Sequence, residues 1–191
     1  VVDTLKKVYD IERLSAKMTY GNANARDMIT LRNSLEKLPE VKNILSTCMS
    51  PKLKQLYEDL DELQDVYELI NKSIIDDPPM TIKDGGIIKI GYDEEIDKLK
   101  TATTEGKSWI VNLEVSKSFV SQVPDRFIRK QTLTTGERYI TEELKNLEGQ
   151  ILGAEEKVVN LEYEEFVKIR EQIAKNVKRL QKTANVVSTL D

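Results

Sequence analysis

Two apolar stripes with coiled-coil spacing lie in the second half of the sequence, and they constrain the fold most strongly. The members of the first stripe recur at alternating steps of three and four: Ile96, Leu99, Thr103, Gly106, Ile110 and Leu113. The second stripe runs from Leu144 to Leu161, skips once to Phe166, and resumes as far as Val187. This spacing is typical of helices that pack along a narrow seam, and a single skip changes the supercoil locally without ending the helix.

The two stripes predict an outgoing helix and a returning helix that pack antiparallel. The returning helix would begin at Thr141, whose hydroxyl can cap it. At about 1.5 Å per residue it would form a rod of roughly 75 Å. Residues 115–140, which we call the connecting segment, would then lie at the far end of the helix pair, roughly 30 Å from the helical body formed by the first part of the chain.

The connecting segment is polar and locally basic, although the whole chain has a net charge of −4. Its charged residues are Lys117, Arg126, Arg129, Lys130 and Arg138, opposed by Asp125 and Glu137. Arginine, lysine, hydroxyl and amide groups hold phosphate oxygens and position a protein on nucleic acid without reading its sequence. The alternative is an ordinary polar loop, because the local excess of positive charge is small.

The first seventy residues predict a body of four or five short packed helices. A helical stripe covers residues 3–18, and Asn24 is placed to cap a second helix over residues 25–38. Pro39 starts a short third helix, and Pro51 is well placed as the first residue of another, whose pattern continues to about residue 72.

Residues 73–92 do not continue the helical pattern of the preceding residues. Pro78 and Pro79 exclude a helix there. Residues 81–82 and 87–90 are rich in β-branched side chains and flank an Asp-Gly-Gly turn, which suggests a small hairpin or a pair of extended strands. Asp93 then follows as a good N-cap for the outgoing helix.

The predicted fold is therefore mainly α, with a compact helical body, a long antiparallel helix pair, and a small irregular or β-containing segment between the two long helices. The predicted division is a helical core over residues 1–92, an outgoing helix over 93–114, the connecting segment over 115–140, and a returning helix over 141–191.

Composition excludes several classes of function. The chain has one cysteine and no histidine, so an internal disulfide, a Cys/His zinc site and a histidine-activated nucleophile are impossible. Gly106-Lys107-Ser108 resembles the end of a phosphate-binding loop, but Thr101 stands where that loop requires glycine. The acidic groups at 76–77 and 93–95 could serve as metal ligands or as an acid/base pair, but they lie at a turn and a helix start, where carboxylates are common.

We therefore expect no catalytic residue, metal site or cofactor in this chain. The sequence has no apolar run of the roughly 18 residues that span a bilayer. It also has no signal-type segment, so a cytoplasmic location without membrane contact is expected.

Several motifs resemble the bacterial MutS family of DNA mismatch repair proteins. The first are Val8 to Leu14 and Gly21 to Asp27, which resemble the helical core domain. The second is the run from Asp76-Asp77-Pro78-Pro79 through Gly85-Gly86-Ile87-Ile88 to Gly91-Tyr92-Asp93-Glu94-Glu95. The third comprises Ile128 to Leu133 and Glu137 to Leu144, which resemble the return of a clamp domain into its lever. The resemblance covers nearly all of the chain in order.

This resemblance implies a fragment of a mismatch repair protein: the core and lever domain with a truncated clamp domain. In that family, homodimers encircle double-stranded DNA, an N-terminal domain inserts a phenylalanine at the mismatch, and a C-terminal ATPase domain drives formation of a sliding clamp. The core and lever link these two domains, and the clamp grips the duplex backbone non-specifically. ATP, Mg²⁺ and the partner MutL would belong to the parent protein, which would work at the bacterial nucleoid.

The connecting segment and the resemblance together predict which residues contact the DNA backbone: Lys117, Arg129, Lys130, Gln131, Thr132 and Thr135. A Lys-Asn dipeptide of the family is Thr134-Thr135 here, which weakens one expected contact. Family members also carry a further segment, with a glycine- and aromatic-rich strand pair, after a stretch like residues 109–114. The alternative function is a coiled-coil scaffold that does not bind nucleic acid, which the long seam and the acidic balance support.

Overall fold

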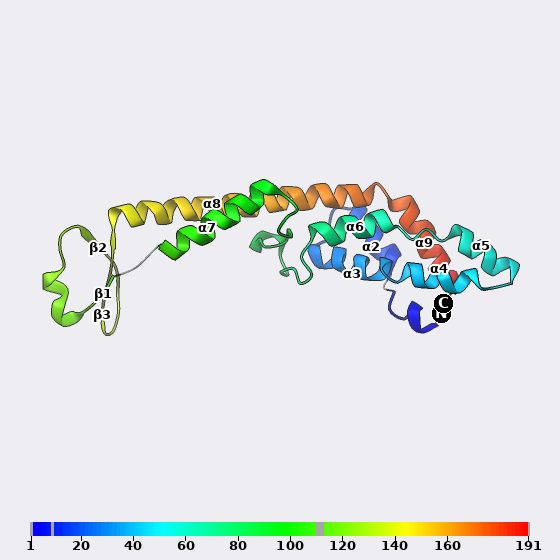
Figure 1. The fold of residues 1–191 in the computed structure, drawn as a ribbon, viewed down its shortest axis with the longest axis horizontal. Helices are drawn as coiled ribbons and strands as arrows, with labels where there is room; N and C mark the ends of the chain where they lie inside the picture. Colours follow the sequence, from blue (N-terminus) through cyan, green and yellow to red (C-terminus); the bar gives the residue numbers. More distant parts are fainter. Residues whose placement is uncertain (1, 9, 110–112, 191) are drawn as a thin grey trace. The chain divides into compact units, whose positions relative to one another are not determined.

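The computed structural model describes residues 2–8, 10–109 and 113–190, which form helices and one small sheet (Figure 1). The chain divides into two compact units, residues 1–92 with 161–191, and residues 93–160. The helices wholly in the first unit are α1 (Val2–Leu5), α2 (Ile11–Thr19), α3 (Ala25–Leu35), α4 (Leu38–Ser46), α5 (Pro51–Asp59), α6 (Gln64–Ser73) and α9 (Val177–Leu190), with a 3-10 turn, η1 (Ile82–Asp84). The second unit contains α7 (Glu94–Trp109), and α8 (Glu142–Ala174) belongs to both. The prediction of a mainly α fold with a small β-containing segment is confirmed.

Helices α2, α3, α4, α6 and α9 of the first unit each bury apolar side chains. Helix α2 packs against α3 and α9, and α3 packs against α6. The predicted cap of α3 is present: the Asn24 side chain accepts the Asp27 N–H at 2.8 Å, and the Asp27 carboxylate accepts the Asn24 N–H at 3.1 Å. The core includes Met28, Leu31, Leu35, Leu45, Ile70 and Phe166, each at most 1% exposed.

Two predicted helices are each divided in two. The stripe over residues 3–18 breaks after α1, and the Asp10 carboxylate caps α2 by accepting the Arg13 N–H at 2.8 Å. The pattern that starts at Pro51 breaks after α5, where Leu63 adopts a left-handed conformation with φ of 53°. Apolar spacing is the same on both sides of each break, so the stripe alone does not reveal the interruption.

The predicted hairpin or pair of extended strands over residues 81–90 is wrong, because its two runs do not pair with each other. Residues 82–84 form the 3-10 turn η1, and Ile88 bridges to Ile74. The Ile75 N–H donates to the Ile87 carbonyl at 3.1 Å. The second β-rich run therefore pairs with the chain that leaves α6.

A buried carboxylate on α8 explains this pairing. Glu162 is completely buried and accepts the backbone N–H groups of Gly86, Ile87 (3.4 Å) and Ile88 (3.3 Å). A buried backbone donor needs a partner, and this carboxylate supplies one where a hairpin would have used a neighbouring strand. Glu162 thus fixes the loop after η1 to α8 within the first unit.

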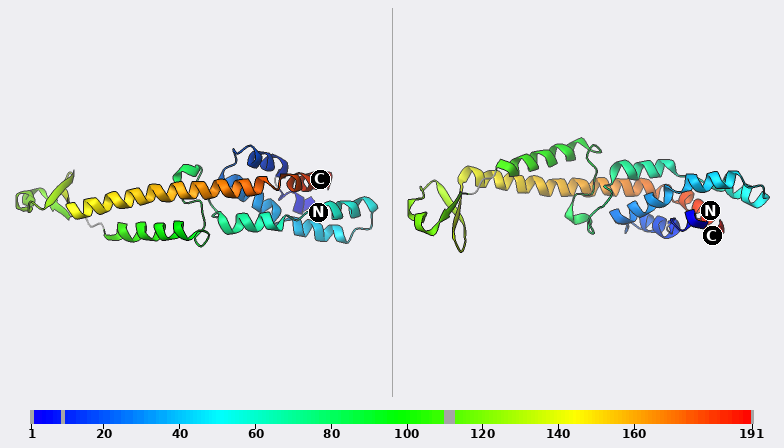
Figure 2. Two further views of the ribbon diagram at one scale, coloured as in Figure 1. Left: turned by 90° about the horizontal axis from the view of Figure 1, so that it is seen from above. Right: turned by 60° about the horizontal axis from the view of Figure 1, so that its bottom comes forward.

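Helices α7 and α8 pack antiparallel within the second unit, as predicted (Figure 2). Near the start of α7, Glu95 accepts from Lys157 at 2.9 Å. Near its end, a Cβ added to Gly106 would lie 2.8 Å from Cδ1 of Ile151, so the small residue allows close approach of the two helices. The Asp93 cap is also present, since its carboxylate accepts the Ile96 N–H at 2.9 Å. Of the first stripe, Ile110 and the side chain of Leu113 lie outside the described residues.

The returning helix over residues 141–191 is not a single rod, which corrects the prediction. The skip between Leu161 and Phe166 remains helical, but the helix is interrupted between α8 and α9. At the interruption, the Asn176 side chain donates to the carbonyl of Gln172 at 3.1 Å and accepts from Arg179 at 2.9 Å. Asparagine favours such local bonds over the interior of a helix.

No helix in the part of the chain that the structure describes is long and apolar enough to cross a membrane.

Candidate nucleic-acid interface

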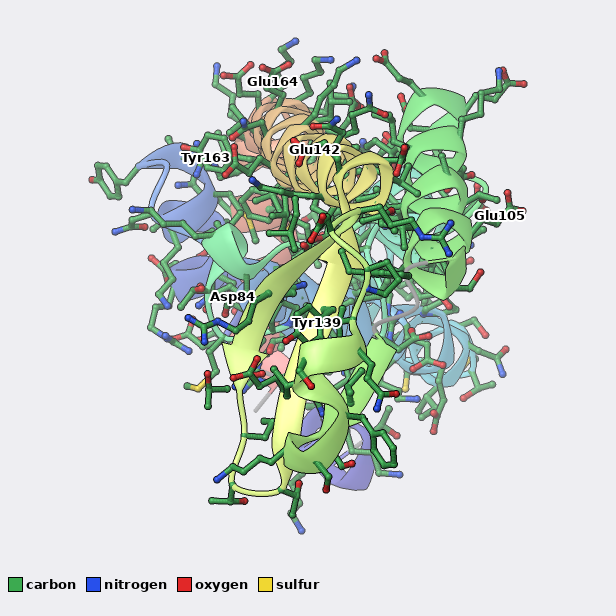
Figure 3. All side chains as sticks on the ribbon, turned by 90° about the vertical axis from the view of Figure 1, so that its left-hand side faces the viewer. Asp84, Glu105, Tyr139, Glu142, Tyr163 and Glu164 are labelled. Atoms are coloured by element: carbon green, nitrogen blue, oxygen red, sulfur yellow. The ribbon has the colours of Figure 1, made fainter. Side chains whose placement is uncertain are left out.

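The connecting segment, together with residues 113–114 and 141, folds as a three-stranded antiparallel sheet in the order β1-β3-β2, which we call the small sheet. The prediction that the outgoing helix extends to residue 114 is wrong, because residues 113–114 belong to β1. Its strands are β1 (Leu113–Ser116), β2 (Phe127–Thr132) and β3 (Gly136–Thr141), and a 3-10 helix, η2 (Lys117–Gln122), follows β1. Tyr139 lies on the central strand (Figure 3) and is 7% exposed. A Cβ at Gly136 would lie 2.3 Å from the Val115 carbonyl oxygen, so only glycine permits this approach of β3 to β1.

A β-bulge in β2 decides which side chains share a face. Arg129 pairs with Tyr139 and Gln131 pairs with Arg138, which leaves Lys130 as the extra residue. Residues directly opposite each other share a face of the sheet, and alternate residues of a strand do so as well. Because Thr132 pairs with Glu137, Arg129 and Thr132 lie on one face. Gln131 lies on the other face with Arg138.

The six predicted contact residues are all exposed, but they do not form a single surface. Arg129 and Thr132 share a face, and the charge of Lys117 acts on Glu137 of that face. Gln131 faces the opposite side, Lys130 reaches toward α8, and Thr135 lies in the turn between β2 and β3. The bulge, which is not visible in the sequence, sets which of the β2 residues share a face.

The face that carries Arg129 contains a network around Glu137. The Tyr139 hydroxyl donates to the Glu137 carboxylate at 2.7 Å, and the Arg129 guanidinium lies 3.4 Å from it. The hydrogen bond from Tyr139, helped by the charges of Arg129 and Lys117, lowers the pKa of Glu137. The same hydrogen bond raises the pKa of Tyr139. Glu137 is therefore ionised at neutral pH and partly offsets the positive charge of this face.

Other residues of the interface were not among the predicted contacts. Arg138 lies opposite Gln131 and is 3.5 Å from the Glu114 carboxylate. The Arg126 guanidinium lies 5.1 Å from the ring centre of Phe127. Only the strand register identifies Arg138 as the cation of the second face, and no local sequence signal supplies that register.

The other polar motifs form ion pairs within the structure. Asp76 pairs with Arg32 at 2.5 Å and with Lys89 at 3.5 Å, and the hydrogen bond from Arg32 lowers its pKa most. Lys107, of the motif that resembles a phosphate-binding loop, lies within α7 and pairs with Glu155. Among the described residues, no three histidine, cysteine or acidic side chains are grouped so that they could hold a metal ion.

Comparison with known proteins decides the family. Residues 1–191 match the family described as MutS domain III. The chain belongs to this MutS family. Three relatives, each named DNA mismatch repair protein MutS, are from Caldanaerobacter subterraneus subsp. tengcongensis (49% identical over 99% of this chain), Clostridium tetani (46% over 99%) and Caldicellulosiruptor bescii (45% over 100%). The chain spans about a quarter of the length of these MutS relatives (25%, 24% and 25%).

The matched region is longer in the MutS relatives than in this chain. The alignment to the Caldanaerobacter protein covers 214 positions, whereas the chain has 191 residues, so at least 23 positions have no residue here. The resemblance in the sequence implied such an additional segment in family members.

Proposed function

We propose that this chain is the part of a DNA mismatch repair protein that grips the duplex backbone and links mismatch recognition to an ATPase domain. Its membership of the MutS domain III family and the printed names of its relatives support this proposal. The observation that carries the gripping role is the set of exposed arginine, lysine, glutamine and threonine side chains on the small sheet. Such groups bind phosphate oxygens without selecting a base sequence.

Arg129 is the principal contact in this proposal. Its side chain is 63% exposed, and its carboxylate partner is 3.4 Å away. The Glu137 side chain is 15% exposed and also accepts the Tyr139 hydroxyl, so it keeps a partner without Arg129. Water and salt screen the exposed guanidinium, so its ion pair contributes little to stability. A DNA phosphate can therefore replace Glu137 as the partner of Arg129 at small cost, while the Thr132 hydroxyl on the same face donates to a second phosphate oxygen.

The link to the rest of the protein runs through α8. Strand β3 ends at Thr141, and its hydroxyl accepts the Leu144 N–H at 3.3 Å in the first turn of α8. No loop separates strand from helix, so a force on β3 acts directly on α8, which continues into the first unit. We propose that residues 93–114 and 141–191 act as the lever and that residues 115–140 act as the clamp. Mismatch reading, ATP and Mg²⁺ binding, homodimer formation and contact with MutL are assigned to the whole protein.

A coiled-coil scaffold that does not bind DNA is the second candidate. It is favoured by one observation: Arg129, Lys130 and Arg138 each have a carboxylate within 3.5 Å. These pairs reduce the field that would attract a polyanion. The two functions are distinguished by whether salt-dependent retention of the whole protein on duplex DNA depends on these cations, since replacing them by alanine would leave retention unchanged if this chain were a scaffold.

The decisive variant for the gripping role is Arg129→Ala in the whole protein. We expect DNA binding to weaken by the same factor for matched and mismatched duplexes. The slope of log binding constant against log salt concentration should become shallower by about one unit, the contribution of one phosphate contact. Arg13→Ala is the matched control, because Arg13 is 59% exposed and also has one carboxylate partner, Asp10. A loss confined to mismatched DNA, or an unchanged slope, contradicts the proposal.

A further inference from the structure

Lys130 differs from the other cations of the small sheet in its backbone position. It is the extra residue of the bulge, between the paired residues Arg129 and Gln131. A bulge re-aims the side chain at the extra position and bends the strand. The direction of Lys130 is therefore set by the bulge and not by the alternation of the strand.

The re-aimed side chain reaches α8. The Lys130 ammonium lies 2.5 Å from the Glu148 carboxylate, and the two side chains are 36% and 33% exposed. The Arg129 pair is longer, at 3.4 Å, and its guanidinium is 63% exposed. Glu137, the partner of Arg129, is 15% exposed, so the difference lies in the cations: Lys130 makes a shorter ion pair than Arg129, and its own side chain is less exposed.

The ion pair gives the small sheet a second connection to α8. The first is the backbone junction between Thr141 and Glu142, where β3 passes into the helix. A single junction leaves rotation about the chain direction unrestrained, whereas a second contact on the neighbouring strand β2 restrains it. Lys130 and Glu148 supply that contact.

We infer that Lys130 is a positioning residue: its ion pair with Glu148 fixes the small sheet on α8 and orients Arg129 toward DNA, and Lys130 itself does not bind phosphate. This inference rests on the proposed gripping function, and it revises the prediction that Lys130 contacts the backbone. The bulge has two consequences under this assignment. It directs Lys130 to Glu148, and it places Arg129 and Thr132 on one face, whereas a regular strand would place them on opposite faces.

Replacing Glu148 by alanine distinguishes a phosphate-binding Lys130 from a positioning Lys130, because the two roles predict opposite changes in DNA affinity. If Lys130 bound phosphate, Glu148→Ala would free it, remove a negative charge near DNA, and strengthen binding. If Lys130 positions the sheet, Glu148→Ala weakens DNA binding by the whole protein, by about fivefold, the effect of a partly exposed ion pair. Lys130→Ala should then weaken binding by the same factor and leave the salt slope unchanged, since no phosphate contact is lost.

The exchanged pair Lys130→Glu with Glu148→Lys provides the rescue. Restoring the ion pair in the opposite order should return affinity to near the wild-type value, although position 130 is then acidic. Glu156→Ala is the matched control, because Glu156 is an exposed carboxylate on the same helix. Tighter binding by Glu148→Ala, or failure of the exchanged pair to bind, overturns the inference.

Amide hydrogen exchange of the free protein tests the positioning role of Lys130 independently of the DNA-gripping role of Arg129. In the free protein, Lys130→Ala and Glu148→Ala should each increase amide hydrogen exchange over residues 127–141, whereas Arg129→Ala should not. Unchanged exchange in both variants refutes the positioning role. An unchanged affinity of Arg129→Ala, with increased exchange in the other two variants, refutes the gripping function instead.

Discussion

Replacing Glu162 by alanine tests how a single buried carboxylate organises the first unit. The carboxylate accepts three backbone N–H groups from the loop after η1. Gly86 is exposed, so its N–H can turn to water when the carboxylate is lost. Ile87 and Ile88 are at most 1% exposed, so their N–H groups would lose the Glu162 acceptor with no access to water in its place.

The expected loss follows from those two donors. Each buried donor left without an acceptor costs about 1–3 kcal/mol. Removal of a buried charge recovers part of this, because the carboxylate had been taken out of water. We therefore expect Glu162→Ala to lower the free energy of unfolding by about 2–4 kcal/mol. For a chain of this size, that corresponds to a fall in Tm of roughly 4–16 °C.

Denaturant unfolding and amide hydrogen exchange of the protein measure the two consequences. Exchange at residues 86–88 should rise first, because the local contact is lost before the unit unfolds. Glu164→Ala is the control: Glu164 lies on the same helix, is exposed (Figure 3), and should change stability by no more than about 0.5 kcal/mol. A Glu162→Ala protein as stable as this control, with residues 86–88 still protected, would refute the assigned role.

Two further variants test other parts of the structure. Gly136→Ala should disrupt the pairing of β1 with β3 and raise amide exchange in both strands, because the new Cβ would lie 2.3 Å from a β1 carbonyl oxygen. Gly149→Ala is the control: a Cβ at this position in α8 has no atom within 4 Å, so the variant should stabilise the protein by up to about 1 kcal/mol. Arg179 donates to Asp61 at 2.7 Å and to Asp65 at 2.6 Å, and these hydrogen bonds lower the pKa of both carboxyls. Because the folded-state pKa values are depressed, this stabilisation is present above the ordinary value of 3.8 and is lost as the pH falls through the lowered values. Urea unfolding should therefore show that Arg179→Met costs roughly 1 kcal/mol at pH 7 and progressively less below pH 4, and a cost that grows in acid would contradict the pairing.

Local signals in the sequence predicted the elements that depend on local chemistry. Asn24, Asp93 and Thr141 cap helices because a side-chain oxygen can reach an N–H two or three residues on, which is a property of a few adjacent residues. The seam of α7 and the first part of α8 was also predictable, because its spacing repeats over several turns. The predicted antiparallel packing of these two helices followed from that spacing.

The features that the sequence did not reveal depend on contacts between distant residues. Glu162 accepts hydrogen bonds from a loop 74 to 76 residues earlier in the chain. No local pattern reveals this contact, so the β-rich run at residues 87–90 suggested a hairpin that does not form. The left-handed Leu63 ends an apolar pattern that would otherwise continue as one helix. The bulge at Lys130 depends on the register of β2 against β3, so the sequence did not reveal that Arg129 and Thr132 share a face.

Crosslinking from the small sheet to DNA shows whether this sheet holds the duplex backbone. In the whole protein with Cys48 replaced by serine, Thr135→Cys would carry a photoactivatable group, and Ser46→Cys, an exposed position in the first unit, would serve as the reference. If the small sheet grips the backbone, crosslinks from position 135 should form at many places along the DNA, equally on matched and mismatched duplexes, and few should form from position 46. No crosslink from position 135, or crosslinks only at the mismatch, would contradict a clamp that holds the backbone without reading its sequence.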